Sequence, residues 1–178
     1  MAIIEEESAL TDSILQVAKL MVAAAATAPK GRGISNLTTA IFTGNDIGSL
    51  IAKMEQMAAE FDLPSFHRDA QNLKQCDVVV LMGTSIAPMN LKKCGLCGFA
   101  NCTEKSKYPQ IPCSFNTGDL GIAMGSAVSV AMNHKIDNRI MYSVGQAAIA
   151  LEIFPKEVLV VYAIPLKASN KNIFFDRN

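Results

Sequence analysis

The hydrophobic residues follow two kinds of pattern along the chain. Over residues 8–27 they recur at spacings of three and four, which is the period of an amphipathic α-helix. A second apolar face predicts a helix at residues 47–61. Pro64 and a cap at residues 117–119 predict the starts of helices at residues 64–75 and 120–134, and a shorter helix is expected at residues 144–151. Continuous runs of branched and apolar residues instead predict buried strands, at residues 36–42, 77–82 and 158–164. We therefore expect an α+β protein with a buried sheet.

Residues 84–117 fit neither pattern. They contain three prolines and four of the five cysteines, and their apolar positions show no period. A loop of this length inside a compact domain is uncommon unless it is functional or supported by a bound group. The prediction is a single α+β domain over residues 1–178, in which residues 84–117 are an inserted, cysteine-rich metal-binding loop.

The cysteines of this loop have the spacing of metal ligands. Two residues separate Cys94 from Cys97 and four separate Cys97 from Cys102, so their thiolates can reach one centre. Cys113 follows after ten further residues and completes four ligands, the usual set for a [4Fe-4S] cluster. Thiols stay reduced inside the cell, which favours metal binding over disulfides. We predict a [4Fe-4S] cluster on these four cysteines, with a zinc ion as the alternative.

Glycines and lysines around the cysteines agree with a bound cluster. Gly95 and Gly98 can take the positive φ angles that tight wrapping around a cluster requires. Four lysines also flank the ligands: Lys92, Lys93, Lys105 and Lys107. They could offset the negative charge of the cluster, or they could simply be the solvated rim of the loop. The fifth cysteine, Cys76, precedes a predicted strand and is interpreted as a small buried residue outside the site.

Charge and composition limit the function. Sixteen basic and sixteen acidic side chains give a formal net charge of zero, which argues against a nucleic-acid partner. The apolar stretch at residues 14–28 follows acidic residues and contains Lys19, so we interpret it as neither a signal peptide nor a membrane span. We expect a soluble, cytoplasmic protein with no membrane partner. Its near-zero net charge also permits self-association.

A second candidate site is the loop of Lys30, Gly31, Arg32 and Gly33. Two cations among glycines could hold a phosphate, for example that of a flavin. This makes Lys30 and Arg32 candidate cofactor-binding residues. The alternative is a glycine cap at the end of the first helix with two exposed basic side chains.

The cysteine segment resembles a small 4Fe-4S domain with the signature C-x₂-C-G-x₃-C and a later fourth cysteine. That domain occurs in the B subunit of Rnf electron-transport complexes and in corrinoid iron–sulfur proteins, where the interval before the fourth cysteine is usually longer. The whole chain, including residues 154–158 and 172–177, resembles a family of uncharacterised ferredoxin-domain proteins from anaerobic bacteria and archaea. Both resemblances imply a bound cluster.

Three further features resemble the nitroreductase fold. They are Ala28-Pro29 after the first helix, Asp119 opening a helix with the pattern D-x-G-x-A, and a last strand framed by Pro155 and Pro165. The resemblance implies a sheet-and-helix sandwich that forms a homodimer and binds FMN at the dimer interface. The arginine-rich motif RRSxR, which holds the FMN phosphate in that family, has no counterpart near the N-terminus here.

Together, the residues and the resemblances predict an iron–sulfur redox protein with an electron-transfer or reductase role. FMN is a candidate second cofactor, and the activity of a nitroreductase-like oxidoreductase is a candidate activity without assigned catalytic residues. The expected partners are a second copy of the chain and a redox protein or small-molecule substrate. The alternative is a non-enzymatic sensor or scaffold in which a cluster or a zinc ion only orders the loop.

Overall fold

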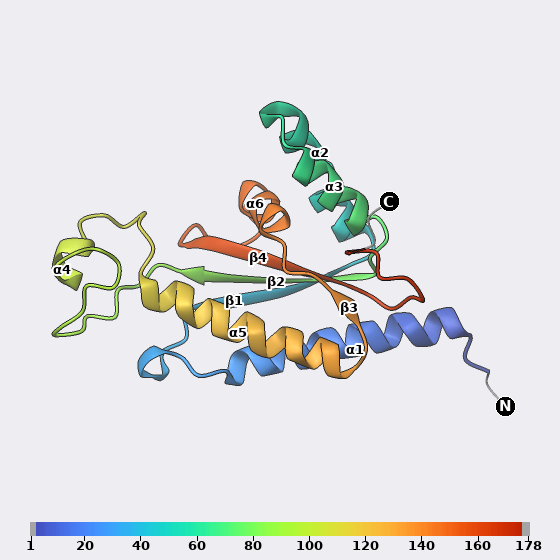
Figure 1. Ribbon diagram of the computed structural model, residues 1–178, viewed down its shortest axis with the longest axis horizontal. Helices are drawn as coiled ribbons and strands as arrows, with labels where there is room; N and C mark the ends of the chain where they lie inside the picture. Colours follow the sequence, from blue (N-terminus) through green and yellow to red (C-terminus); the bar gives the residue numbers. More distant parts are fainter. Residues whose placement is uncertain (1–2, 176–178) are drawn as a thin grey trace.

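The part of the chain that the structure describes, residues 3–175 of a computed structural model, contains a sheet of four antiparallel strands. Their spatial order is β1-β2-β4-β3 (Figure 1). The strands are β1 (Leu37–Thr43), β2 (Val78–Ser85), β3 (Asp137–Asn138) and β4 (Val158–Lys167). β2 and β4 form the centre of the sheet, which is where continuous apolar runs are expected.

The predicted burial of β2 on both faces is confirmed. Val78, Val80 and Met82 belong to one hydrophobic core, whereas Val79 and Leu81 belong to a second. All five side chains are at most 1% exposed. Because side chains alternate across a strand, a run without polar residues needs a core on each face of the sheet.

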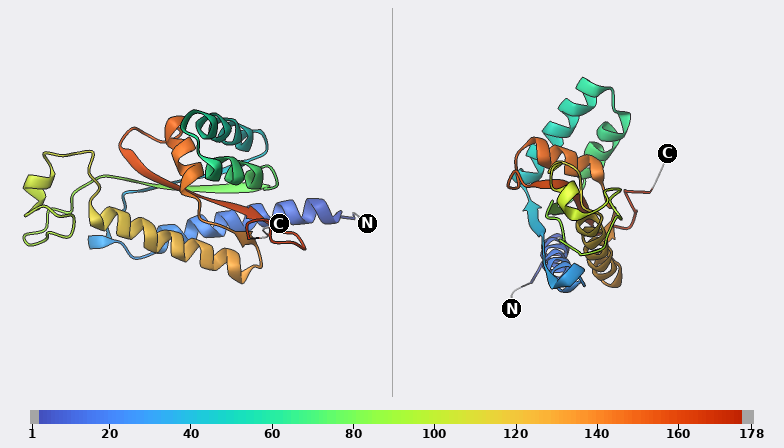
Figure 2. Two further views of the ribbon diagram at one scale, coloured as in Figure 1. Left: turned by 45° about the horizontal axis from the view of Figure 1, so that its top comes forward. Right: turned by 90° about the vertical axis from the view of Figure 1, so that its left-hand side faces the viewer.

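Helices cover both faces of the sheet. α1 (Glu6–Thr27) and α5 (Ser114–Asn133) pack against each other on the first face. On the second face lie α2 (Asn45–Phe61), α3 (Pro64–Leu73) and α6 (Tyr142–Ala150), as Figures 1 and 2 show. The molecule is therefore the α+β sandwich that the nitroreductase resemblance implies.

Among residues 3–175, α1 alone is long and apolar enough to cross a membrane by length and composition. A core helix passes the same test, so the finding is weak support for a span. Five residues of α1 are buried in the first core at helical spacings: Ile14, Val17, Ala18, Met21 and Ala25. They pack α1 against α5 and the sheet.

One predicted boundary near the cysteines is wrong. The helix expected from residue 120 begins already at Ser114, and Cys113 is its N-cap residue. Thr117, which was expected to precede the helix, instead donates its hydroxyl to the Ser114 carbonyl inside the first turns (3.2 Å). Asn116 also lies within the helix and accepts a hydrogen bond from the Ala87 N–H (2.9 Å), so a long-range contact fixes this start.

Residues 86–113 project from the end of β2 at one end of the molecule and return to the start of α5 (Figure 1, left). They contain α4 (Cys102–Lys105) and otherwise turns and irregular backbone. The helical turn η1 (Gly31–Gly33) contacts α5. The fold therefore brings the two candidate sites of the sequence toward the same end of α5.

Candidate metal centre

The structure places the four predicted ligands in this projecting segment and at its exit. Cys94 and Cys97 flank the first turn of the site, Cys102 is the first residue of α4, and Cys113 is the N-cap of α5. Cys113 is buried, with 6% of its surface exposed, and the other three are partly exposed. All four are free thiols.

Two glycines shape the turn that carries Cys94 and Cys97. Gly95 and Gly98 have φ angles of 154° and 88°, which glycine adopts with little strain. The Gly98 N–H donates to the Gly95 carbonyl oxygen over 2.9 Å and closes the turn. The positive φ angles expected from the sequence are therefore present.

Reciprocal capping fixes Cys102 at the start of α4. Asn101 Oδ1 accepts a hydrogen bond from the Glu104 N–H (2.9 Å), and Glu104 Oε2 accepts one from the Ala100 N–H (3.0 Å). This arrangement closely resembles a capping box. The Ser106 hydroxyl donates to the Cys102 carbonyl (2.8 Å). These bonds orient Cys102 without using its sulfur, which leaves the thiol for a metal.

Cys113 stands at the N-terminus of a long helix. The first turn of a helix carries N–H groups without intrahelical partners, which give it a partial positive charge. A negatively charged thiolate ligand at the N-cap of the 20-residue α5 is stabilised by that charge. Cys113 also connects the partly exposed segment of the other ligands to the packed helix layer, because α5 contributes to the first core.

The four thiols are not gathered into a ready-made metal site. Within residues 3–175, no group of three or more His, Cys, Asp or Glu side chains is placed so that it could hold a metal ion. The fold therefore brings the predicted ligands to one end of the molecule, and their assignment to a metal remains a prediction from their spacing.

Lys105 gives this segment an unpaired buried charge. Its side chain is 1% exposed, and no residue that the structure describes accepts a hydrogen bond from its Nζ. The other three lysines near the cysteines are exposed: Lys92, Lys93 and Lys107. The interpretation of the lysines as an exposed, solvated rim of the loop therefore fits these three but not Lys105. Because an unpaired buried ammonium costs several kcal/mol, the segment needs an anion near Lys105.

A metal centre with four thiolate ligands fits this need. The four ligand charges outweigh the charge of the metal core, so such a centre is a net anion whether it contains iron and sulfide or zinc. Cys102 lies three residues before Lys105 on the same helical turn, so one predicted ligand shares a helix face with the buried ammonium. The charge and the four free thiols of the segment therefore fit the chemistry of the group, although the thiols are not gathered in this structure, and the cysteine spacing favours iron–sulfur over zinc.

An apolar hollow adjoins the cysteines. One cavity of about 480 Å³ is lined by Leu91, Lys93, Cys94, Gly95, Leu96 and Phe115. A second, of about 330 Å³, shares Leu96 and Phe115 and extends toward Pro29, Gly31 and Asp119. The two cavities therefore adjoin at Leu96 and Phe115. Together they give a small molecule access to the neighbourhood of Cys94.

The structure shows other contacts for the two candidate phosphate ligands. Lys30 Nζ donates to carbonyl oxygens at the C-terminal end of α1, those of Ala25 (2.9 Å), Ala26 (2.9 Å) and the C-cap residue Ala28 (2.7 Å). Arg32 Nη1 donates to the Met89 carbonyl oxygen (3.0 Å). These contacts compete with a phosphate, since the three hydrogens of the Lys30 ammonium already have acceptors. The glycine cap of the alternative is not formed either, because α1 ends at Thr27 with Ala28 as its C-cap residue.

Asp119 of α5 lies next to the loop that contains Lys30 and Arg32. Its buried carboxylate accepts the Gly31 N–H at both oxygens, at 3.0 and 3.1 Å. The sequence pointed to Asp119 only through the D-x-G-x-A resemblance, and nothing local indicated its partner 88 residues away. A carboxylate at this position would repel a phosphate, so it is a further argument against a phosphate site on Lys30 and Arg32.

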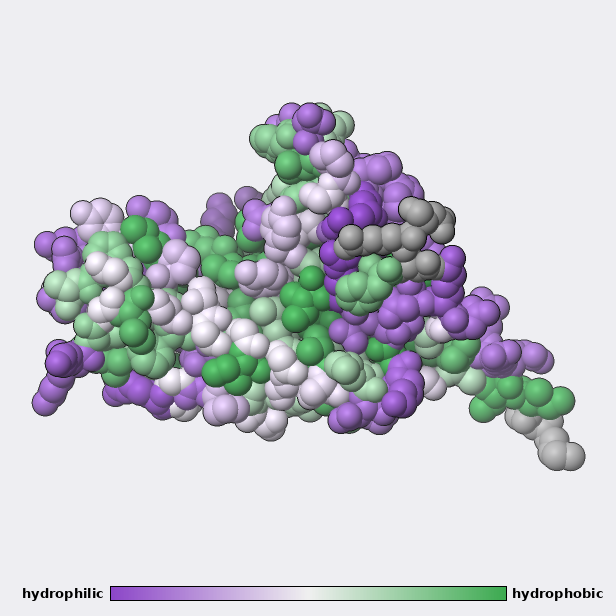
Figure 3. Space-filling model, in the orientation of Figure 1, coloured by the Kyte–Doolittle hydropathy of each residue, from purple (hydrophilic) through white to green (hydrophobic). Residues whose placement is uncertain are grey.

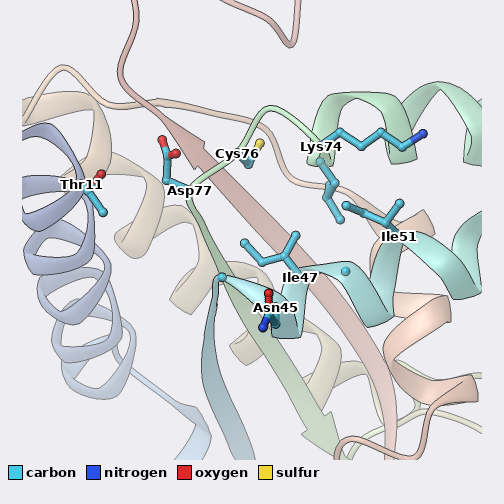
Figure 4. Close-up of a pocket in the computed structure, with 10 residues that line it drawn as sticks. Thr11, Asn45, Ile47, Ile51, Lys74, Cys76 and Asp77 are labelled. Carbon is cyan, nitrogen blue, oxygen red and sulfur yellow. The ribbon is translucent and has the colours of Figure 1, made fainter. Parts of the chain in front are cut away.

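Cys76 lies at the opposite end of β2, in a different environment. It lines a cavity of about 500 Å³ together with Asn45, Ile47 and Asp77 (Figure 4). Its thiol donates to the Asn72 carbonyl oxygen (3.2 Å), and burial raises its pKa to about 12, so it stays protonated near neutral pH. The eight residues of β2 span roughly 26 Å, which separates Cys76 from the other cysteines.

Solved structures share the sandwich. The nitroreductase CinD from Lactococcus lactis, in complex with nicotinic acid, matches with a TM-score of 0.65 over 95% of this chain and 81% of that one, at 11% identity. A nitroreductase with bound FMN from Desulfitobacterium hafniense matches with a TM-score of 0.60 over 96% and 81%, at 14% identity. The protein therefore has a nitroreductase-like fold, as predicted.

Sequence comparison shows the family to which the chain belongs. Residues 110–177 match the family model described as "Uncharacterized protein containing a ferredoxin domain (DUF2148)". An uncharacterised protein from Archaeoglobus fulgidus is 34% identical over 182 residues, which cover 98% of this chain and 97% of that protein. The chain belongs to this family of ferredoxin-domain proteins, and that prediction is confirmed. The matched segment of the family model includes Cys113 and begins after Cys102.

Proposed function

We propose that this protein carries electrons through a [4Fe-4S] cluster held by Cys94, Cys97, Cys102 and Cys113. The observation that supports this most is Lys105, a buried ammonium without a partner among the described residues, in the segment that carries the cysteines. Membership of a ferredoxin-domain family is the second support. When bound, such a cluster takes up and releases one electron at a time.

Some residues of the segment would hold the cluster in place, and others would leave it accessible to a partner. Cys113 is buried at the base of α5 and ties the centre to the packed helix layer. Leu96, between the first two ligands, is 72% exposed. A redox partner protein could therefore approach the turn through an apolar contact next to Cys94 and Cys97, which keeps the electron path short.

A reductase role is the second candidate function, and the apolar hollow beside Cys94 supports it. A small-molecule substrate or a flavin seated there would lie next to a predicted cluster ligand. FMN is bound by one nitroreductase of the same fold. In this chain the side chains of Lys30 and Arg32 already donate to backbone carbonyl oxygens, so a flavin phosphate would have to bind to other groups.

The proposed assembly is a homodimer that uses the outer face of α5. Gly118, Gly121 and Gly125 have open space where a side chain would begin, within the part of the chain that the structure describes. Ile122 and Met132 on the same helix are 49% and 66% exposed. Along most of α5 the surface is white and green rather than purple (Figure 3). Small and apolar residues of this kind let a second helix approach closely.

The proposed location is the cytoplasm, where the thiols of the ligands stay reduced before the cluster is inserted. The burial of one α1 face in the first core supports a soluble protein. The zero net charge supports the absence of a nucleic-acid partner.

Electron exchange distinguishes this function from the sensor or scaffold alternative. Anaerobically purified protein is mixed with a reduced low-potential ferredoxin while the cluster absorbance and the circular dichroism are followed. We expect rapid bleaching, recovery with a mild oxidant, and an unchanged circular dichroism spectrum. A cluster that exchanges no electrons, but whose removal disorders residues 86–113, would favour the alternative.

A further inference from the structure

The buried lysine in the cysteine segment is unusual in its burial and in its lack of a partner. Lys105 is among the largest fully buried side chains of the described residues, although it belongs to the four-residue helix α4 on a projecting segment. Lysine is almost never fully buried unless it is paired. Its neighbours in sequence, Glu104, Ser106 and Lys107, are all exposed. The Lys105 side chain therefore points into the segment rather than out of it.

The direction of the side chain follows from the helix geometry. Helical side chains lean toward the N-terminus, and residues three apart lie on the same face. Lys105 therefore leans back over the turn that begins with Cys102. The backbone of this turn is held at both ends, since the Lys105 N–H donates to the Asn101 carbonyl (3.1 Å) and the Tyr108 N–H donates to the Lys105 carbonyl (2.9 Å). The backbone of Lys105 is therefore fixed relative to one predicted ligand, and the burial of the side chain keeps the ammonium inside the segment.

A ring contact also holds together the part of the segment that contains α4. The rings of Phe99 and Tyr108 stack with centroids 5.3 Å apart, and these residues lie on either side of α4 in sequence. This contact closes the chain around the helix without a disulfide. The Lys105 ammonium is buried in this segment, which separates it from the exposed Lys92, Lys93 and Lys107.

We propose that the Lys105 ammonium is the internal counter-charge of the cluster and sets its reduction potential. This inference rests on the proposed function, because it needs a cluster on the four cysteines. Reduction adds one electron from an external donor, such as dithionite in a titration, and makes the centre more negative by one charge. A fixed cation stabilises the reduced form more than the oxidised form, so Lys105 raises the potential.

The same charge has opposite effects on the two forms of the protein. With the cluster in place, the Lys105 ammonium would offset part of the negative charge of the centre, which would stabilise the segment. Without the cluster, the ammonium is buried and unpaired, so it destabilises the segment. Replacing the charge with an apolar chain of similar length should therefore weaken the cluster-bound form and strengthen the cluster-free form.

The test compares Lys105→Met with Lys105→Arg, which keeps the charge, and with Lys107→Met, which removes an exposed charge from the same segment. Each variant is prepared with its cluster and titrated with dithionite under redox mediators, and the reduced signal is read by electron paramagnetic resonance. The cluster-free forms are unfolded with urea. For Lys105→Met we expect the ratio of reduced to oxidised cluster to fall at least tenfold at a fixed solution potential, which corresponds to a reduction potential lower by about 59 mV for one electron. We also expect the cluster-free form of this variant to be at least as stable as the cluster-free wild type.

Two results would overturn the inference. The first is that the clusters of Lys105→Met and Lys107→Met have the same reduction potential. The second is that cluster-free Lys105→Met is less stable than the cluster-free wild type, because this would reveal a protein partner for the ammonium. If Lys105→Met cannot retain a cluster although its cluster-free form is stable and Lys105→Arg retains one, the inference is supported. A wild-type protein without a cluster would instead reject the proposed function itself, so the two failures are distinguishable.

Discussion

Gly145 sets the distance between α6 and the central strand β4. A Cβ atom added at this position would lie 1.9 Å from the Val161 carbonyl oxygen and 3.0 Å from the Tyr162 Cα. Both neighbours are backbone atoms, so no side chain can rotate away. The change Gly145→Ala should therefore push α6 away from the sheet.

The size of the effect follows from two opposing contributions. Alanine in a helix is favoured over glycine by about 1 kcal/mol, which would stabilise the variant. Ordinary contacts begin near 3.4 Å, so the helix must move by about 1.5 Å to accommodate the methyl group. Overpacking of this kind costs about 1–3 kcal/mol, and more against rigid backbone. Because the clash is with backbone, the cost should lie in the upper part of this range, at about 2–3 kcal/mol. The net loss should then be about 1–2 kcal/mol, which lowers the Tm by roughly 2–8 °C for a chain of this size.

Thermal and urea unfolding of the cluster-free protein, followed by circular dichroism, measures this loss. Gly48→Ala is the matched control, because Gly48 lies in α2 with open space around the added atom, and it should gain about 0.5–1 kcal/mol. A Gly145→Ala protein as stable as the wild type, together with a stabilised Gly48→Ala protein, would refute the close packing of α6 on β4.

Three other changes test the site, the assembly and the buried thiol. Cys113→Ser should degrade the cluster, whereas Cys76→Ser should leave its absorbance spectrum unchanged, and the reverse outcome would make Cys76 the fourth ligand. Gly125→Leu should convert the proposed dimer to a monomer in sedimentation experiments, while a monomeric wild type would reject the dimer. Burial raises the pKa of Cys76 to about 12 from an unfolded value near 9.0. The unfolded chain therefore releases this proton first, so stability should fall as the pH rises from about 9 to 12. Urea unfolding across that range should show a smaller decline in Cys76→Ala, and an identical decline would contradict the burial of the thiol.

The layers of the fold could be predicted because their signals are local and periodic. The apolar run of β2 required a core on each face, and the helical spacing of α1 placed its buried stripe. The end of β4 was missed because the prediction stopped it before Pro165, whereas the strand continues to Lys167. On the side of β4 that faces β3, Pro165 lies between the Met141–Ala163 bridge and the pairs that β3 makes with Leu166 and Lys167. No residue of β3 pairs with Pro165, so the N–H that proline lacks removes no hydrogen bond between these strands.

The candidate site was predictable in its residue types and less so in its surroundings. The cysteine spacing and the glycines between the cysteines are readable in the sequence, and the positive φ angles at Gly95 and Gly98 agree with them. The burial of Lys105 could not be read, because α4 is too short to show a buried face and the contacts around it come from tertiary folding. The bond between Gly31 and Asp119 is long-range for the same reason.

The central claim is that Cys94, Cys97, Cys102 and Cys113 hold a [4Fe-4S] cluster. The measurement that tests it most directly is iron, sulfide and zinc analysis of the anaerobically purified protein, with absorbance spectra before and after dithionite. The account predicts a brown protein with about four iron and four acid-labile sulfide per chain, and a visible absorbance that dithionite bleaches. A colourless protein with stoichiometric zinc and no iron would contradict it.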